Sequence, residues 1–126
     1  MSKKIELEYT FNTSAKVLYN RLSTPAGLSE WFADDVNLKN DNFTFVWDGS
    51  EQIAELVSKR DNKHIRFKWK DSDDDCFFEF KIQKDELTGD LALMITDFAE
   101  DEDDKSDAID LWDSQISELK HAIIYM

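Results

Sequence analysis

The chain opens with an alternation of apolar and polar residues that predicts a β-strand. Residues 5–11 read Ile-Glu-Leu-Glu-Tyr-Thr-Phe, and this period of two places one face of the strand against a core. Polar residues that can cap a helix come next, followed by apolar residues at helical spacing, which predicts a short helix over about residues 14–23. Thr24 as N-cap and Pro25 at the first helical position predict a second short helix that ends near residues 31–32.

Between residues 35 and 99 the pattern changes to short strands separated by turn residues. Six strands are predicted, over residues 36–38, 43–47, 52–59, 65–70, 76–83 and 91–98. Asp48 and Gly49 form a strong signal for a tight hairpin. Clean alternation predicts that Ile65, Phe67 and Trp69 face inward, whereas the phase of the third and sixth of these strands stays open.

The C-terminal segment, from about residue 106 to 125, has the clearest helical pattern. Its apolar residues step by three and four, at Ile109, Trp112, Ile116, Leu119 and Ile123. A helix with such a stripe must cover it, and one face of the predicted sheet is the only sufficient apolar surface. The sequence therefore predicts a single α+β domain over residues 1–126: a strand, two short helices, six strands and a long helix.

Five short motifs follow one another along these elements. They are Phe11-(x)2-Ser14-(x)2-Val17-Leu18, Pro25-(x)5-Trp31-Phe32, Phe43-(x)-Phe45-(x)-Trp47-(x)-Gly49, Ile65-Arg66-Phe67-(x)-Trp69 and Trp112-(x)3-Ile116-(x)2-Leu119. In this order they resemble the START-like or SRPBCC superfamily, and within it the group similar to the activator of the 90-kDa heat-shock chaperone's ATPase. The resemblance covers nearly the whole chain. It implies the helix-grip fold, a bent antiparallel sheet of about seven strands wrapped around the C-terminal helix, with a cavity that takes an apolar ligand in many relatives.

The charge of the chain is unevenly distributed. Residues 1–70 hold 11 Lys and Arg against 10 Asp and Glu, whereas residues 71–126 hold 4 against 18, and the formal net charge is −13. Phosphate binding needs a concentrated basic surface, so we expect no nucleic acid partner. An anionic membrane surface is disfavoured for the same reason.

Several absences in the sequence bound its location and chemistry. No stretch approaches 18 consecutive apolar residues, and the first residues lack the apolar core of a secretory signal. The single cysteine, Cys76, has no partner for an intrachain disulfide and is expected to be a small buried residue at the start of a strand. We therefore expect a cytoplasmic protein without a cofactor, as a monomer or weak homodimer.

Aromatic side chains are abundant, with nine Phe, four Trp and three Tyr. The candidates to line the space under the last helix are Trp31, Phe32, Phe45, Trp47, Phe67, Trp69, Phe78, Phe80, Met94, Phe98, Trp112 and Ile116. These side chains either fill the space or leave a usable pocket, and both interpretations stay open. A pocket needs polar groups to orient a ligand, and the candidates are Tyr19, Ser58, Thr96 and Gln115.

Acidic residues cluster in two segments, 71–75 and 100–107. Neither matches the spacing of a calcium-binding loop, so no metal site is predicted. The helix-grip topology places both segments at one end of the sheet, which predicts an acidic pole. The candidate residues for binding a basic protein partner there are Asp73, Asp74, Asp75, Asp101, Asp103 and Asp104.

Motifs for catalysis are missing from the sequence. There is no Gly-rich phosphate loop, HExxH, GxSxG or CxxC, and the two histidines, His64 and His121, are expected at the surface. The favoured function is therefore a non-enzymatic binding protein with a small apolar ligand in the cavity. The alternatives are a protein-interaction module, similar to a chaperone regulator, that docks basic partners through the acidic pole, and an enzyme of the cyclase or dehydratase kind.

Overall fold

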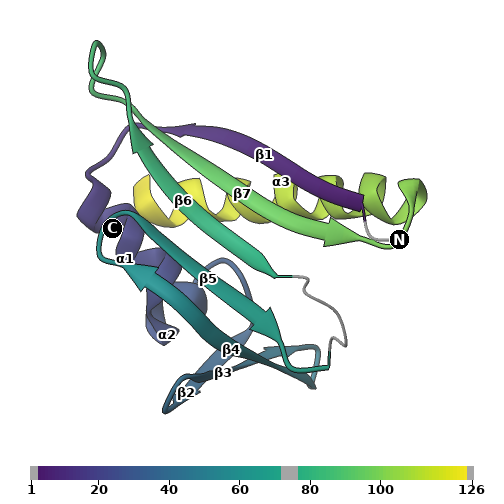
Figure 1. Ribbon diagram of the computed structural model, residues 1–126. Coiled ribbons are helices and arrows are strands. Elements are labelled where there is room, and N and C mark those ends of the chain that lie inside the picture. The colour runs from purple at the N-terminus through teal and green to yellow at the C-terminus, as the bar shows by residue number, and fades with distance from the viewer. Residues whose placement is uncertain (1–2, 72–76, 125–126) are drawn as a thin grey trace.

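Seven strands form one antiparallel sheet that curves around a long helix (Figure 1). The computed structural model describes residues 3–71 and 77–124. The strands are β1 (Lys3–Phe11), β2 (Asp35–Lys39), β3 (Asn42–Trp47), β4 (Ser50–Arg60), β5 (His64–Trp69), β6 (Phe78–Lys84) and β7 (Leu91–Ala99), in the spatial order β1-β7-β6-β5-β4-β3-β2. The helices are α1 (Ala15–Ser23), α2 (Pro25–Leu28) and α3 (Glu102–Ile124). This arrangement confirms the predicted α+β helix-grip fold.

The position of α3 on the sheet decides where a cavity can form. The helix packs mainly on β1 and β7, at one edge of the sheet, and its C-terminal part lies beside α1 (Figure 1). The Tyr9 hydroxyl of β1 donates a hydrogen bond of 2.5 Å to Asp113 of α3, and Lys120 lies over the ring of Phe11. The helix is thus fixed to the β1 edge, while β3, β4 and β5 curve away from it.

The turns follow the local sequence signals. Trp47 pairs with Ser50 across a two-residue turn, in which Asp48 and Gly49 have φ angles of 49° and 81°. A turn with two positive φ angles matches the twist of a hairpin and favours an Asp-Gly pair. The predicted hairpin is therefore confirmed.

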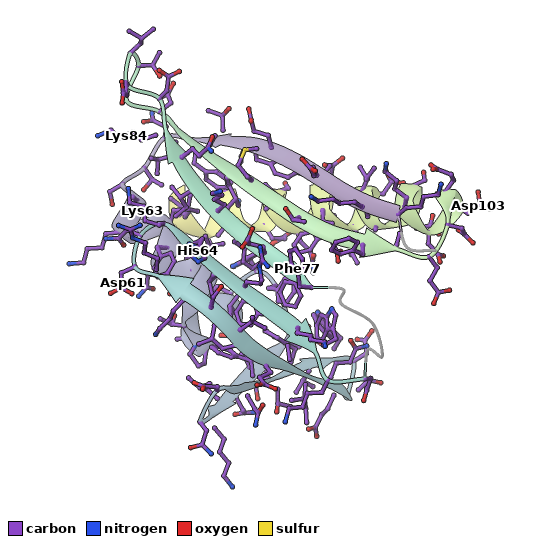
Figure 2. The ribbon with its side chains drawn as sticks, viewed as in Figure 1. Asp61, Lys63, His64, Phe77, Lys84 and Asp103 are labelled. Atoms are coloured by element: carbon purple, nitrogen blue, oxygen red, sulfur yellow. The ribbon has the colours of Figure 1, made fainter. Side chains whose placement is uncertain are left out.

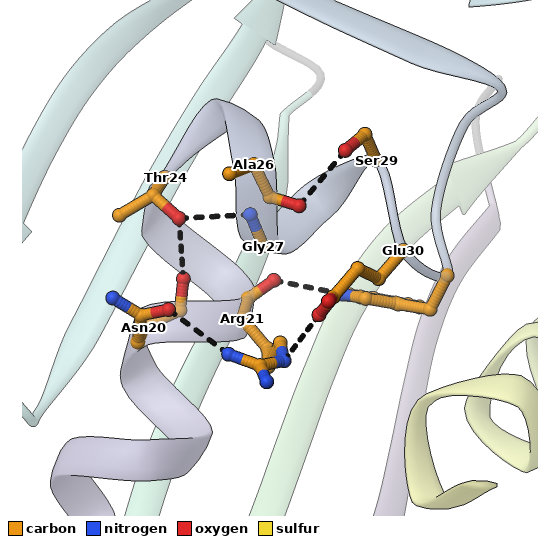
Figure 3. Close-up of polar contacts among 8 residues, drawn as sticks. Asn20, Arg21, Thr24, Ala26, Gly27, Ser29 and Glu30 are labelled. Carbon is orange, nitrogen blue, oxygen red and sulfur yellow. Dashed lines mark hydrogen bonds and ion pairs between the residues drawn. The ribbon is translucent and has the colours of Figure 1, made fainter. Parts of the chain in front are cut away.

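Both short helices begin at side-chain caps: α1 at Ser14, one of the polar residues before it, and α2 at the predicted Thr24. The Ser14 hydroxyl accepts a hydrogen bond from the Val17 amide at 3.1 Å, and the Thr24 hydroxyl accepts one from Gly27 at 2.9 Å (Figure 3). However, α2 ends at Leu28, three residues before the predicted end. The amides of residues 32 and 33 both donate to the Leu28 carbonyl, which closes the helix in a tight turn.

The last helix begins at Glu102, four residues earlier than predicted. The Asp101 carboxylate accepts a hydrogen bond of 2.9 Å from the Asp104 amide and caps the helix. Three acidic residues then occupy the first turn, where the helix dipole favours negative charge. Most of the acidic segment 100–107 is therefore helical.

The core lies between the concave face of the sheet and the three helices. Its fully buried side chains include Ile5, Leu18, Leu22, Leu28, Phe45, Ile65, Phe67, Phe78, Phe80, Leu93, Ile95 and Ile116. The predicted stripe of α3 is buried at its centre, because Trp112, Ile116 and Leu119 are at most 5% exposed. Among the described residues no polar or charged residue is fully buried in this core.

Candidate functional site

A cavity of about 330 Å³ lies between α3 and the part of the sheet that curves away from it. It is lined by Phe32, Trp47, Gln52, Trp69, Asp97, Ala108, Leu111, Trp112 and Gln115. Six of these nine residues are apolar, four of them aromatic, and three carry polar side chains. This is the place where the resemblance to START-like proteins predicts a ligand.

Phe32 holds two opposite walls of the cavity together. Its carbonyl accepts hydrogen bonds from the Trp47 indole at 2.7 Å and from the Gln115 amide at 3.0 Å. Its ring packs edge-on against Trp47 and stacks on Trp112, with centroids 5.4 and 5.7 Å away. The turn after α2 therefore connects β3 to α3 and sets the orientation of three lining side chains.

Trp47 and Trp69 form the wall on the side of the sheet. Each is the last inward residue of its strand, following Phe45 in β3 and Phe67 in β5. Their ring centroids lie 6.2 Å apart, and Trp69 also packs on Phe78 at 4.9 Å. Both rings are half-buried, because α3 does not cover this end of the sheet.

Asp97 places a carboxylate in the cavity wall. One of its oxygens accepts a hydrogen bond of 2.9 Å from the Trp112 indole, and the other accepts one of 2.8 Å from the Phe98 amide. Burial raises the pKa of Asp97 above its ordinary value, although the two hydrogen bonds oppose that shift. No lysine or arginine in the described part of the chain forms an ion pair with it. Among the described residues, its charge is therefore stabilised by two hydrogen bonds and by no cationic side chain.

The structure divides most of the predicted lining residues into two groups. Phe32, Trp47, Trp69 and Trp112 line the cavity. Six others fill the core, where they are at most 6% exposed: Trp31, Phe45, Phe67, Phe78, Phe80 and Ile116. They lie nearer the centre of the sheet, where the helices pack closely. Phe98 belongs to neither group and packs on Phe77, with ring centroids 5.2 Å apart. The interpretation of a filled core therefore holds for most of the space under α3, and the interpretation of a pocket holds for one end of it.

Met94 does not belong to this site, which corrects the prediction. Its neighbours in β7, Leu93 and Ile95, are fully buried on the concave face. Alternation therefore turns Met94 to the convex face, opposite Glu8 of β1 and Lys81 of β6. The phase of this strand was left open by its sequence, in which apolar residues occupy both faces.

Of the four predicted polar residues, only Gln115 lines the cavity. Thr96 pairs with Glu6 and Glu79 and lies on the same convex face as Met94, and Ser58 is exposed. The Tyr19 hydroxyl donates to the carbonyl of His64 at 3.0 Å, and burial, helped by the charge of Asp61, raises its pKa to about 12.

Sequence reasoning missed four lining residues, namely Gln52, Asp97, Ala108 and Leu111. A signal existed for two of them. Asp97 continues the inward series of Leu93 and Ile95, and Ala108 lies one helical turn before Trp112. The cavity face of β4 was hidden by a register shift in that strand, which obscures its alternation.

The candidate acidic residues are only partly described. Asp101, Asp103 and Asp104 lie at the N-terminal end of α3, whereas Asp73, Asp74 and Asp75, like Cys76, lie outside the described residues. Figure 2 shows Asp103 at the opposite end of the molecule from Lys63 and Lys84. The acidic pole stays a prediction.

The described residues contain neither a candidate metal site nor a candidate membrane-spanning helix. No group of three or more His, Cys, Asp or Glu in the described ranges is arranged to hold a metal ion. No helix within those ranges is long and apolar enough to cross a membrane.

Comparisons with known proteins agree with this architecture. A family model described as the START-like superfamily domain matches residues 1–124. The chain belongs to the START-like superfamily. This START-like domain is also 42% identical to BfR322 from Bacteroides fragilis, whose solution structure it matches with a TM-score of 0.69 over 96% of this chain and 90% of that chain.

More distant structures share the fold of this START-like domain. The solution structure of the Aha1 dimer from Colwellia psychrerythraea is 17% identical, with a TM-score of 0.82 and 96% of each chain covered. The crystal structure of MLL2253 from Mesorhizobium loti is 16% identical, with a TM-score of 0.79 and 98% of each chain covered. At these identities the likeness shows the fold alone. No match to a curated protein was found.

Proposed function

We propose that this START-like domain is a non-enzymatic binding protein that holds a small apolar ligand between the curved sheet and α3. The observation that carries the proposal is the cavity of about 330 Å³, which is lined by four aromatic side chains. Ligand sites are typically apolar clefts of about 300–1,000 Å³ with a few polar groups that fix orientation. Gln52, Asp97 and Gln115 supply such groups here.

The composition of the cavity supports binding rather than catalysis. Asp97 is the one titratable group among its nine lining residues. Proton transfer usually requires an acid or base together with a group that positions or stabilises the reacting atoms. A single carboxylate among tryptophans fits the orientation of a bound molecule better.

A cavity-filling variant tests this proposal. Ala108→Phe places a ring in the cavity, and Ser114→Phe, at an exposed position of the same helix, is the matched control. The neutral fluorescent probe N-phenyl-1-naphthylamine is titrated into each folded protein. We expect saturable binding to the original chain and to Ser114→Phe, and at least a tenfold weaker affinity for Ala108→Phe.

Two results would contradict the proposal. One is a lack of saturable binding to the original chain with this probe and with two smaller ligands, benzyl alcohol and benzylamine. The other is an unchanged affinity of the correctly folded Ala108→Phe protein, since the probe would then bind elsewhere.

A second candidate function is the docking of a basic protein at the acidic end of α3. Asp101, Glu102 and Asp103 are exposed there, and Lys3 is the one cation that forms an ion pair with them among the described residues. Such a surface accelerates association with a basic partner by long-range attraction. This candidate is tested separately from the cavity, because it needs no bound ligand.

A decalysine peptide is a suitable probe for that second candidate. We expect Asp103→Asn combined with Asp107→Asn to weaken its binding at low salt by several fold. The control pair, Glu86→Gln with Asp90→Asn, removes the same charge from the loop between β6 and β7. Equal losses of peptide affinity in the two double variants would show that the peptide is attracted by the net charge alone, and would contradict a docking surface at the end of α3.

A further inference from the structure

We infer that the ligand of this cavity is an organic cation, with an ammonium group carried on an apolar body. The inference rests on the proposed function and specifies its chemical class. It follows from the combination of an aromatic wall, a half-buried carboxylate and the absence of basic residues among the nine that line the cavity.

The aromatic wall is the first argument. Trp47, Trp69 and Trp112 approach the cavity from three different elements, and Phe32 completes the wall. Tryptophan has the most negative ring face of the natural side chains, so a cation over it gains electrostatic energy, and more so where water is excluded. A neutral apolar ligand would gain contact area from these rings and no such electrostatic term.

The carboxylate is the second argument. Each oxygen of Asp97 accepts one hydrogen bond, from Trp112 and from the Phe98 amide, and a carboxylate oxygen has two acceptor sites. One site on each oxygen therefore remains for a ligand. A half-buried charge without a cationic partner is costly, and the raised pKa of Asp97, caused mainly by burial, reflects this cost. An ammonium group in the cavity would offset it, whereas an anionic ligand would add to it.

The charge around the cavity is the third argument. Ala108, Leu111 and Trp112 belong to the part of α3 between residues 102 and 113, which holds six acidic residues and one basic residue. Asp104 and Asp107 lie one helical turn before Ala108 and Leu111. This rim attracts cations and repels anions, in agreement with the net charge of −13.

A matched pair of ligands tests the inference. Benzylamine is a cation at pH 7, and benzyl alcohol is neutral and nearly the same size. Each is titrated into the 15N-labelled protein while the indole N–H signal of Trp112, which donates to Asp97, is followed by NMR. The same titrations are repeated with Asp97→Asn, which keeps the size of the side chain and removes its charge.

We expect benzylamine to bind at least about tenfold more tightly than benzyl alcohol, and Asp97→Asn to bring the two affinities close together. If the two ligands bind equally to the original chain, or the alcohol binds better, the inference is wrong and the proposed function stands. If neither ligand shifts the signal, both are wrong. Should Asp97→Asn not fold, the ratio of affinities for the original chain still decides the question.

Discussion

Trp112 belongs both to the core and to the cavity. Its ring stacks on Phe32 and packs edge-on against Phe80, and the residue is 5% exposed. Its indole N–H donates to Asp97. One side chain therefore fixes α3 on the sheet and also orients the carboxylate of the candidate site.

Replacing this side chain should destabilise the fold. Trp112→Ala removes a buried ring and leaves a void, and we expect a loss of roughly 3–5 kcal/mol in the free energy of unfolding. Urea denaturation followed by circular dichroism measures it. A loss below about 1 kcal/mol would mean that the stripe of α3 is not buried as described.

Asp97 should make stability depend on pH in an unusual direction. Because burial raises its pKa, the folded state holds this proton more tightly than the unfolded chain does. The resulting stabilisation is complete below the unfolded pKa of about 4 and is lost as the pH rises through the folded pKa. Asp97→Asn lacks this dependence.

The comparison of the two proteins isolates that effect, since their other titratable groups are the same. Between pH 4 and pH 7, the free energy of unfolding of the original chain should fall relative to that of Asp97→Asn. Urea denaturation of both proteins at several pH values measures the difference. A difference that stays constant, or changes the other way, would show that Asp97 is not desolvated.

At this scale the sequence predicted most of the inward apolar side chains, with Met94 as an exception, but not which of them border a cavity. Phe45 and Trp47 belong to the same inward series of β3, yet Phe45 is fully buried and Trp47 lines the cavity. The difference depends on where α3 ends its contact with the sheet. Alternation along a strand contains no information on that tertiary distance.

Among the elements, α3 depends on the polar groups at its N-terminus. Asp101→Ala removes the cap of the helix, and we expect a loss of about 1 kcal/mol in the free energy of unfolding. Asp110→Ala, at an exposed position inside the same helix, is the control and should change stability little. Chemical denaturation measures the free energy of unfolding of both variants. Equal losses of stability in the two variants would contradict the capping role of Asp101.

The junction of α1 and α2 depends on close packing at Gly27 (Figure 3). A Cβ atom at this position would lie 2.3 Å from the Asn20 carbonyl oxygen and 2.7 Å from the Arg21 Cα. Because these are backbone atoms, α2 would have to move away from α1. An ion pair between Arg21 and Glu30 and a hydrogen bond from the Trp31 indole to the Arg21 carbonyl also hold this junction.

Gly27→Ala should therefore cost roughly 1–3 kcal/mol of stability, as overpacking usually does. Thermal unfolding measures the effect, and Ala26→Ser, at the exposed neighbouring position, is the control. A stability equal to that of the original chain would show that the two helices are not held at this separation.

The positions of helices and strands were predictable where local signals are strong, whereas the residues at which they begin and end were harder to predict. The cap at Thr24 and the Asp-Gly hairpin are local and were predicted correctly, and the cap of α1, Ser14, is one of the polar residues that precede this helix. The start of α3 was placed too late, because a run of acidic residues is equally compatible with a solvated loop. The cap at Asp101 and the helix dipole decide in favour of the helix.

For the whole molecule, the order of elements predicted a long helix on one face of a sheet, and the resemblance to START-like proteins implied the bent helix-grip sheet. The apolar stripe of a long helix after six strands can be buried only against one face of the sheet, and the observed sheet curves around this helix (Figure 1). The cavity was not predictable in the same way. It arises because α3 packs on β1 and β7 at one edge of the sheet, while β3 to β5 diverge from the helix and leave tryptophans between them.

The central claim is that a ligand binds among Trp47, Trp69 and Trp112, and the four tryptophans of the chain allow a direct measurement. Their indole N–H groups give separate signals in a 1H–15N NMR spectrum, assigned with single Trp→Phe variants. Trp31 serves as an internal control, because its indole N–H donates a hydrogen bond to the Arg21 carbonyl and its ring does not line the cavity. On titration with benzyl alcohol, the three lining signals should shift with one common dissociation constant while the Trp31 signal shifts least. Saturation without shifts of the lining signals, or equal shifts of all four, would contradict binding in this cavity.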